Sequence, residues 1–201
     1  MAKKITIGVP VYKAKSTLDK LLASILTQSM SDEVAVILAN DYPEDNETYT
    51  YVYSRYPELD ITIIDCMENT GPGLARQRAL DACKTEWITF MDADDVLMSP
   101  FALEELYNNI TPNSIEVQGP FFQEVQEGNL DSAQKMQLMQ NGQQIPPRIM
   151  PRNDIEHPWV FGRLYRVSFL RQQGIQFSKL RAMEDGEFNW KIRMSIEGSN
   201  L

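Results

Sequence analysis

A group of carboxylates follows an apolar segment near the middle of the chain. Residues 87–91 are apolar enough to form a buried strand, and Asp92, Asp94 and Asp95 come directly after it. In an extended chain, Asp92 and Asp94 point to the same side and can bind one hard divalent cation, directly or through water. Such ligands suit Mg²⁺ or Mn²⁺ bound to a substrate phosphate. Taken alone, the triplet is equally compatible with a solvated turn at a strand end.

A glycine-rich loop lies upstream, between a strand and a helix, at residues 69–78. Gly71 and Gly73 permit a tight turn and close backbone approach, a helix N-terminus favours an anion, and Arg76 can reach a phosphate or a base. A loop of this composition is also common as a simple turn. Neither a GxxxxGKS/T phosphate loop nor a GxGxxG sequence occurs, which disfavours ATP hydrolysis and dinucleotide binding.

Two adjacent carboxylates, Glu184 and Asp185, stand at the start of the last predicted helix. Acidic residues stabilise helix N-termini through the helix dipole, so their position alone requires no catalytic role. A carboxylate held near a metal-phosphate site can also accept a proton from a hydroxyl. On the residues alone, the structural explanation is favoured.

Strands and helices alternate through the first half of the chain, which places these residues. Three helices are predicted: one begins after Ser16, one follows the acidic residues 44–47 and runs to about Arg55, and one follows residues 71–73 and runs to Ala82. The predicted strands are residues 5–9, 34–38, 61–64 and 87–91. Because they are apolar on both faces, we expect a parallel sheet covered by helices on both sides. Ligands of such sheets bind beyond the carboxyl ends of the strands.

The second half is less regular. Residues 115–125 predict one long or bent strand, and 128–151 is a polar, Gln-rich loop with a short helix near 133–139. We expect 128–153 to be the most mobile part of the chain and to face the acceptor. Residues 159–173 predict a helix closed by Gly174, and 188–196 a last helix.

Composition narrows the class of protein. The 201 residues carry a net charge of −9 and 43% hydrophobic residues, as expected for a globular, ordered chain. The acidity disfavours general binding to nucleic acid or anionic membranes. Two cysteines, no export signal and no apolar run near the roughly 18 residues of a membrane span predict a reducing, cytoplasmic location.

Taken in order, these segments resemble the inverting family 2 glycosyltransferases of GT-A fold. The resemblance rests on residues 5–12, 38–41, 69–76, 87–97 and 159–165 and on the pair Glu184-Asp185. It implies an α/β fold with a mostly parallel, Rossmann-like sheet and helices on both faces. It also implies a single catalytic domain, 1–201, with a nucleotide-sugar-binding half (1–98) and an acceptor-side half (99–201).

The resemblance also implies roles for individual residues. Pro10, Tyr12 and Asp41 would hold the uracil and ribose of a UDP-sugar, with Asp41 able to pair with the uracil imide. Asp185 matches the general base of the family. The remaining expected positions are Asn69, Arg76, Asp92 and Ala93 at the nucleotide sugar, Asp92 and Asp94 at Mn²⁺ or Mg²⁺, and Glu184, Trp159 and Arg163 on the acceptor side.

The implied function is metal-dependent transfer of a sugar from a UDP-sugar to a hydroxyl acceptor, by single displacement with inversion. Residues 40–43 (Asn-Asp-Tyr-Pro) depart from the usual two aspartates followed by Gly-Ser, which leaves the base preference open, and Gln77 replaces the usual Asn. Many relatives continue past the last helix, so we expect either a naturally short protein or a piece lacking a C-terminal segment. His157, the only histidine, is expected at the surface or on the acceptor side.

Two alternatives stay open at this stage. An apolar strand followed by residues 92–96 (Asp-Ala-Asp-Asp-Val) also resembles the nucleophile motif of haloacid-dehalogenase-type phosphatases, in which the first aspartate attacks phosphorus. That motif usually sits on the first strand, whereas three strand-helix units precede it here. The second alternative is a GT-A-like domain that binds a nucleotide-sugar without turnover.

Overall fold

A computed structural model describes the structure of the chain. The described residues are 2–42, 44, 51–52, 54–119, 122–123, 148–149 and 159–198. The chain divides into two compact units, Met1–Gln118 with His157–Leu201, and Gly119–Glu156. In the second unit, strands β6 (Phe122–Gln123) and β7 (Arg148–Ile149) pair antiparallel. The single catalytic domain stays a prediction. The helix expected near 133–139, the mobility expected of most of 128–153 and the place of His157 lie outside the described residues.

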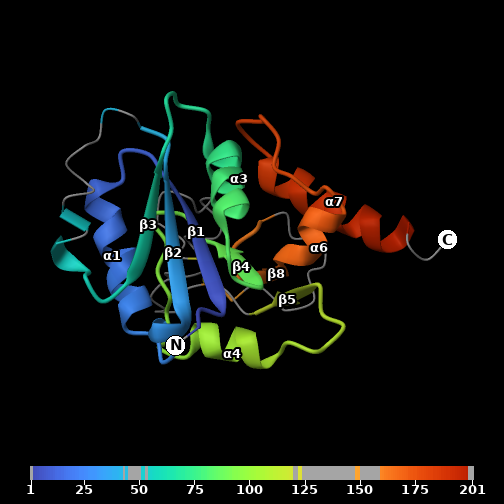
Figure 1. The fold of residues 1–201 in the computed structure, drawn as a ribbon, viewed down its shortest axis with the longest axis horizontal. Coiled ribbons are helices and arrows are strands. Elements are labelled where there is room, and N and C mark those ends of the chain that lie inside the picture. Colours follow the sequence, from blue (N-terminus) through green and yellow to red (C-terminus); the bar gives the residue numbers. More distant parts are fainter. Residues whose placement is uncertain are drawn as a thin grey trace, which may run out of the picture. The chain divides into compact units, whose positions relative to one another are not determined.

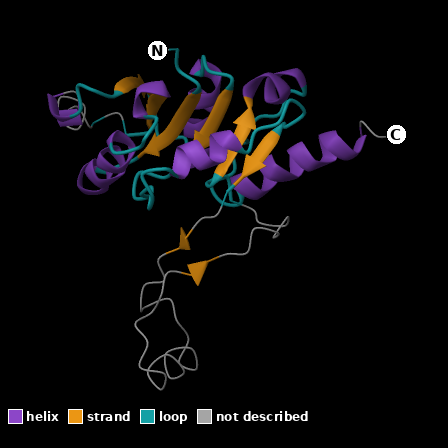
Figure 2. Ribbon diagram, turned by 90° about the horizontal axis from the view of Figure 1, so that it is seen from below, coloured by secondary structure: helices purple, strands orange, loops and turns teal. Residues whose placement is uncertain are grey.

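One mixed sheet forms the centre of the first unit. Its described strands follow the order β3-β2-β1-β4-β8-β5, and Figure 2 shows them side by side with helices on both sides. Their bounds are β1 Ile5–Val11, β2 Val34–Asn40, β3 Asp60–Asp65, β4 Trp87–Phe90, β8 Arg163–Arg166 and β5 Glu116–Gln118. β1 to β4 run parallel, while β8 runs antiparallel to both β4 and β5. The predicted mostly parallel sheet is confirmed.

Helices cover both faces of this sheet (Figure 1). Leu18 and Leu22 of α1 and Leu103 of α4 pack with β1 and β2 in one core cluster. Leu80 of α3, Leu170 of α6 and residues of α7 pack with Phe90 in the other. The bounds are α1 Lys15–Leu26, η1 Ser31–Glu33, α3 Pro72–Ala82, α4 Ala102–Asn108, α6 Val167–Gln172 and α7 Glu184–Gly198. No helix among the described residues is long and apolar enough to cross a membrane.

Two element predictions in the second half are corrected. The helix expected over 159–173 is β8 followed by the short helix α6, and its first residues, 159–162, lie outside any regular element. β8 pairs with two strands at once, a tertiary constraint that overrides the local helical spacing. The strand expected over 115–125 is divided between β5 and β6.

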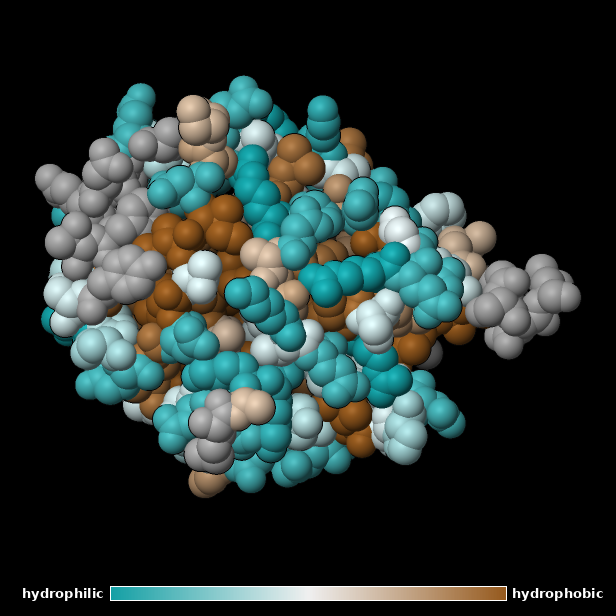
Figure 3. Space-filling model, viewed as in Figure 1, coloured by the Kyte–Doolittle hydropathy of each residue, from teal (hydrophilic) through white to brown (hydrophobic). Residues whose placement is uncertain are grey.

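The edge strand β3 is less buried than its neighbours. Ile61, Ile63 and Ile64 are half-buried, whereas β1 and β2 are almost wholly buried. Figure 3 shows hydrophobic side chains between hydrophilic ones over the region of β2 and β3. The core that fixes the sheet therefore centres on β1 and β2.

Gly8 lets β1, β4 and α3 approach closely. A Cβ at Gly8 would lie 2.9 Å from the Cβ of Ala79 on α3 and 3.1 Å from the ring of Phe90 on β4. Both distances are shorter than ordinary van der Waals contact. Since α3 carries Arg76 on the same helix, this contact sets how closely Arg76 approaches the end of β4.

We predict that Gly8→Ala lowers the free energy of unfolding by roughly 1–3 kcal/mol, the usual cost of overpacking a core. Urea unfolding measures the change. Ala79→Gly is the matched second substitution, because it removes the atom nearest the added methyl group. The double variant should be less destabilised than the sum of the single variants, and strict additivity would contradict the contact.

Candidate active site

A cleft of about 700 Å³ lies beyond the carboxyl ends of the parallel strands. Five segments contribute to it: the β1–α1 connection, the end of β2, the loop before α3, the turn after β4, and the segment before α7. All the residues expected at the nucleotide sugar and metal line this cleft, whereas the expected base Asp185 is not in its lining; the lining includes Pro10, Tyr12, Asp41, Asn69, Arg76, Asp92, Ala93 and Asp94, together with Glu184. The structure therefore brings together residues that are up to 174 positions apart.

Arg76 occupies the centre of the charged part of the site. The residue is only 3% exposed and projects from α3. Nη2 donates to Asp92 Oδ1 at 2.5 Å, while Nη1 donates to Glu184 Oε1 at 3.0 Å and to Asp185 Oδ1 at 2.8 Å. Burial lowers the pKa of Arg76, but Asp92 and Asp185 raise it overall. One cation thus joins the end of β4 to the start of α7.

Asp185 is held from two sides in the first turn of α7. Its Oδ1 accepts from Arg76, and its Oδ2 accepts from the backbone N–H of Val160 at 3.4 Å. Burial raises the pKa of Asp185 to about 6; Arg76 lowers it, whereas Glu184 and Asp92 raise it. A carboxylate with this pKa is ionised at neutral pH and has greater proton affinity than an ordinary Asp, which suits a general base.

The carboxylates after β4 form a turn and not the extended segment that the sequence predicted. The N–H of Asp95 donates to the carbonyl of Asp92 at 3.0 Å, and the N–H of Asp92 donates to Asp95 Oδ2 at 2.9 Å. Burial raises the pKa of Asp95 to about 6. In this turn Asp92 and the exposed Asp94 both line the cleft, as the extended geometry was expected to allow.

The donor set suits a divalent cation that takes its other ligands from the substrate. Among the described residues, no group of three His, Cys, Asp or Glu side chains has metal-binding geometry. Asp92 and Asp94 supply carboxylate oxygens, and Mg²⁺ commonly binds through one or two carboxylates, water and substrate phosphates. The residues present therefore fit Mg²⁺ or Mn²⁺ at this position.

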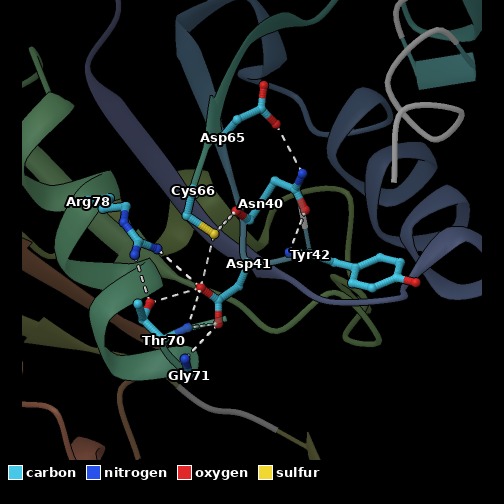
Figure 4. Close-up of polar contacts among 8 residues, drawn as sticks. All are labelled: Asn40, Asp41, Tyr42, Asp65, Cys66, Thr70, Gly71 and Arg78. Carbon is cyan, nitrogen blue, oxygen red and sulfur yellow. Dashed lines mark hydrogen bonds and ion pairs between the residues drawn. The ribbon is translucent and has the colours of Figure 1, made fainter. Parts of the chain in front are cut away.

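Asp41 is the hub of a second network, shown in Figure 4. Its carboxylate accepts from the backbone N–H groups of Thr70 (3.0 Å to each oxygen) and Gly71 (2.6 Å), and from the Thr70 hydroxyl (2.9 Å). Arg78 Nη1 lies 3.2 Å from Oδ1, and Nη2 donates to the Thr70 hydroxyl at 2.7 Å. The Cys66 thiol lies 3.2 Å from the same Oδ1.

This network fixes the state and the task of Asp41. Burial acts to raise the pKa of Asp41, but the donors on Thr70, Cys66 and Gly71 lower it overall, so the carboxylate stays ionised. Its acceptor positions are already used, and the residue is 3% exposed. Pairing with a uracil imide would require one of these donors to be exchanged. In the structure, Asp41 holds the loop that carries Asn69 and Gly71.

Two expected acceptor-side residues lie outside the cleft lining. Arg163 is buried in β8, where it forms an ion pair with Glu116 of β5. Trp159 stacks on Phe161 with ring centroids 5.4 Å apart, and its carbonyl accepts from Asn189 Nδ2 of α7 at 3.0 Å. The Trp159 carbonyl therefore ties this segment to α7, and the next residue, Val160, donates its N–H to Asp185.

Sequence reasoning missed two cations that line the cleft, Lys13 and Arg181. Lys13 has a φ of 52° and places its ammonium 5.3 Å from the ring centroid of Tyr12 and 4.9 Å from that of Tyr42. Arg181 lies in the connection before α7. Neither residue belongs to a spacing pattern. The one signal in the sequence was that two cations, Lys179 and Arg181, come shortly before the carboxylates Glu184 and Asp185.

A family comparison matches the model of glycosyl transferase family 2 to residues 6–174. Because this match covers most of the chain, the chain belongs to glycosyl transferase family 2. Poly(ribitol-phosphate) beta-N-acetylglucosaminyltransferase TarP of Staphylococcus aureus is 31% identical over 108 residues, which are 53% of this chain and 32% of that protein.

Solved structures show the same fold. Staphylococcus aureus TarS in complex with UDP-GlcNAc matches with a TM-score of 0.71 at 21% identity, over 94% of this chain and 52% of that one. Mannosyltransferase PcManGT of Pyrobaculum calidifontis, in complex with GDP-Man and Mn²⁺, matches with a TM-score of 0.68 at 17% identity, over 97% and 53%. The predicted GT-A fold is confirmed, and the chain spans about a third to a half of these proteins.

We predict that Arg76→Met lowers the free energy of unfolding by roughly 3 kcal/mol at pH 8, since it leaves three carboxylates without their shared cation. At pH 5 the loss should be smaller. Asp185, with a pKa of about 6, is then mostly protonated and needs less compensation. Urea unfolding at the two pH values measures this, and an equal loss at both would contradict the charge explanation.

Proposed function

We propose that this chain transfers a sugar from a UDP-sugar to a hydroxyl acceptor by a single displacement that inverts the anomeric carbon. The observation that carries the proposal is that Arg76 contacts both Asp92, a proposed metal ligand, and Asp185, the proposed base. On one side it holds Asp92 of the metal-type pair, and on the other it holds Asp185. Arg76 thereby joins the cleft proposed for the donor diphosphate to Asp185, the residue that follows the cleft-lining Glu184.

The proposed donor half is built from the loop that Asp41 holds. Tyr12 is half exposed and packs edge-on against Tyr42 with ring centroids 5.5 Å apart, which offers an aromatic wall for a nucleoside. Asn69 lines the cleft beside it. UDP-GlcNAc in TarS and GDP-Man in PcManGT show that this fold serves more than one nucleotide, and the sequence-based preference for uridine makes UDP the proposed one.

The proposed chemistry uses the carboxylates in two roles. Asp92 and Asp94 would hold Mn²⁺ or Mg²⁺, which as a Lewis acid neutralises charge on the departing diphosphate. Asp185 takes the proton of the acceptor hydroxyl as that oxygen attacks the anomeric carbon. Arg76 keeps Asp185 ionised and oriented for this step, and Glu184 shares the same Nη1. The acceptor is proposed only as a hydroxyl compound.

The proposed compartment is the cytoplasm. Cys66 and Cys83 are both free and buried, as expected for a protein of a reducing compartment.

Release of nucleoside diphosphate from a panel of UDP-sugars and GDP-sugars tests the proposal. UDP release that depends on Mn²⁺ and is lost in EDTA supports it. Asp94→Asn should lose the metal-dependent part of UDP binding, because it removes a carboxylate ligand. Inorganic phosphate released from a phosphomonoester would instead support the phosphatase alternative, and UDP binding without any release would support a binding domain.

We predict that Asp185→Asn leaves UDP binding intact and lowers transfer by roughly 10²–10⁴-fold, the range for loss of a general base. Glu184→Gln is the matched control on the same helix turn and should lower transfer less. Wild-type transfer should fall as the pH drops below about 6, since Asp185 is then protonated. A rate at or near wild type in Asp185→Asn would show that the proton acceptor lies elsewhere.

A further inference from the structure

Three of the described residues that line the cleft are cationic, and they differ in what they contact. Arg76 is buried and shared by three carboxylates. Lys13 places its ammonium over the rings of Tyr12 and Tyr42. Arg181 is exposed and forms no hydrogen bond or ion pair with the part of the chain that the structure describes. Arg181 is thus the cleft cation whose donors are available to a ligand.

The segment that carries Arg181 is fixed at both ends. At one end, a Cβ on Gly73 would lie 2.9 Å from the carbonyl oxygen of Ser178, so this backbone rests directly on α3. At the other end, the Glu184 carboxylate accepts from Arg76. The connection therefore crosses the start of α3 along a defined path, and Arg181 lies within it.

The side chain of Arg181 is directed across the same loop that Asp41 holds. Its Cγ would lie 3.7 Å from a Cβ on Gly71, and the N–H of Gly71 donates to Asp41. The aliphatic part of the Arg181 side chain therefore lies over the loop before α3, and Arg181 also lines the cleft. Arg181 therefore lies over Gly71 in the cleft that Tyr12 and Asp92 also line.

The charge of the cleft requires such a cation. Asp92, Glu184 and Asp185 share the guanidinium of Arg76, and Asp94 also lines the cleft, so the carboxylates here outnumber this one cation before any diphosphate enters. One divalent cation balances only part of the combined charge of these carboxylates and a diphosphate. A further cation with unused donors reduces that repulsion, and a guanidinium matches phosphate oxygens in a bidentate arrangement.

We propose that Arg181 binds a phosphate of the nucleoside diphosphate from the α7 side of the cleft. The inference rests on the proposed function and extends it, since it adds a donor-binding residue that is distant in sequence from the first half of the chain. Arg181 acts on binding of the donor and its diphosphate product, while Asp185 acts on proton transfer.

Isothermal titration of wild type and Arg181→Gln with UDP, UMP and uridine in the presence of Mn²⁺ tests this role. Arg181→Gln should raise the Kd of UDP by roughly 10- to 100-fold, the range for one hydrogen bond between charged groups. The Kd of uridine should stay within about twofold, because the nucleoside wall is unchanged. Arg181→Lys keeps the charge without the fork and should give an intermediate Kd.

Lys179→Gln is the matched control. Lys179 is exposed in the same segment, carries the same charge and does not line the cleft. Its loss should leave the Kd of UDP within about twofold, whereas an equal loss in both variants would mean a diffuse charge effect and overturn the inference. Unchanged melting temperatures would show that both variants fold.

The outcomes separate the two levels of the argument. Wild type that binds UDP, together with an Arg181→Gln variant that binds it equally well, overturns the role of Arg181 and leaves the proposed function standing. Wild type that binds neither UDP nor GDP with Mn²⁺ overturns the proposed function and this inference with it. A parallel loss of uridine binding in Arg181→Gln would assign Arg181 to the base or ribose and overturn phosphate contact.

Discussion

The active-site half of the fold depends on one buried guanidinium shared by three carboxylates. Arg76 comes from α3, Asp92 follows β4, and Glu184 and Asp185 begin α7. Without the cation, three like charges would repel at a partly buried point; without the carboxylates, the guanidinium would be buried and unpaired. Neither group is stable alone, so the ends of β4 and α7 are tied to one position on α3. The positions of the proposed metal ligands and the proposed base are thereby coupled.

Two carboxylates of the proposed site, Asp185 and Asp94, differ in their environment. Asp185 is largely buried and has a pKa of about 6, set first by burial and then by the balance between Arg76 and the nearby carboxylates. Asp94, by contrast, is exposed and lines the cleft. A buried carboxylate of raised proton affinity suits proton transfer, while an exposed carboxylate suits a cation. The proposed division of roles thus follows from environment and not from residue type.

The sequence predicted the strands, and with them most of the residues that line the cleft, because the apolar runs that identify a strand are local. Continuous apolar runs identify β1, β2 and β4, and residues that follow parallel strands must meet at one sheet edge. It missed β8, since a four-residue strand with arginines at both ends is compatible with helical spacing and is stabilised only by pairing with β4 and β5. It missed Arg181 because the path of that segment depends on Glu184 contacting Arg76, 108 positions earlier.

Asp41 shows why residue identity and residue task can separate. From the sequence, Asp41 at the end of β2 was expected to bind the uracil base. In the structure its carboxylate instead accepts from the N–H groups of Thr70 and Gly71, 29 and 30 positions later. Because those donors use its oxygens, the proposed effect of Asp41 on a nucleoside is indirect, through the shape of the loop that it holds. In the proposed function, selectivity would then depend on the groups that this loop presents, Asn69 among them, and on the Tyr12 ring. On this proposal, where the loop and not the buried carboxylate would meet the base, changes in a few exposed side chains would suffice to accommodate a different nucleotide.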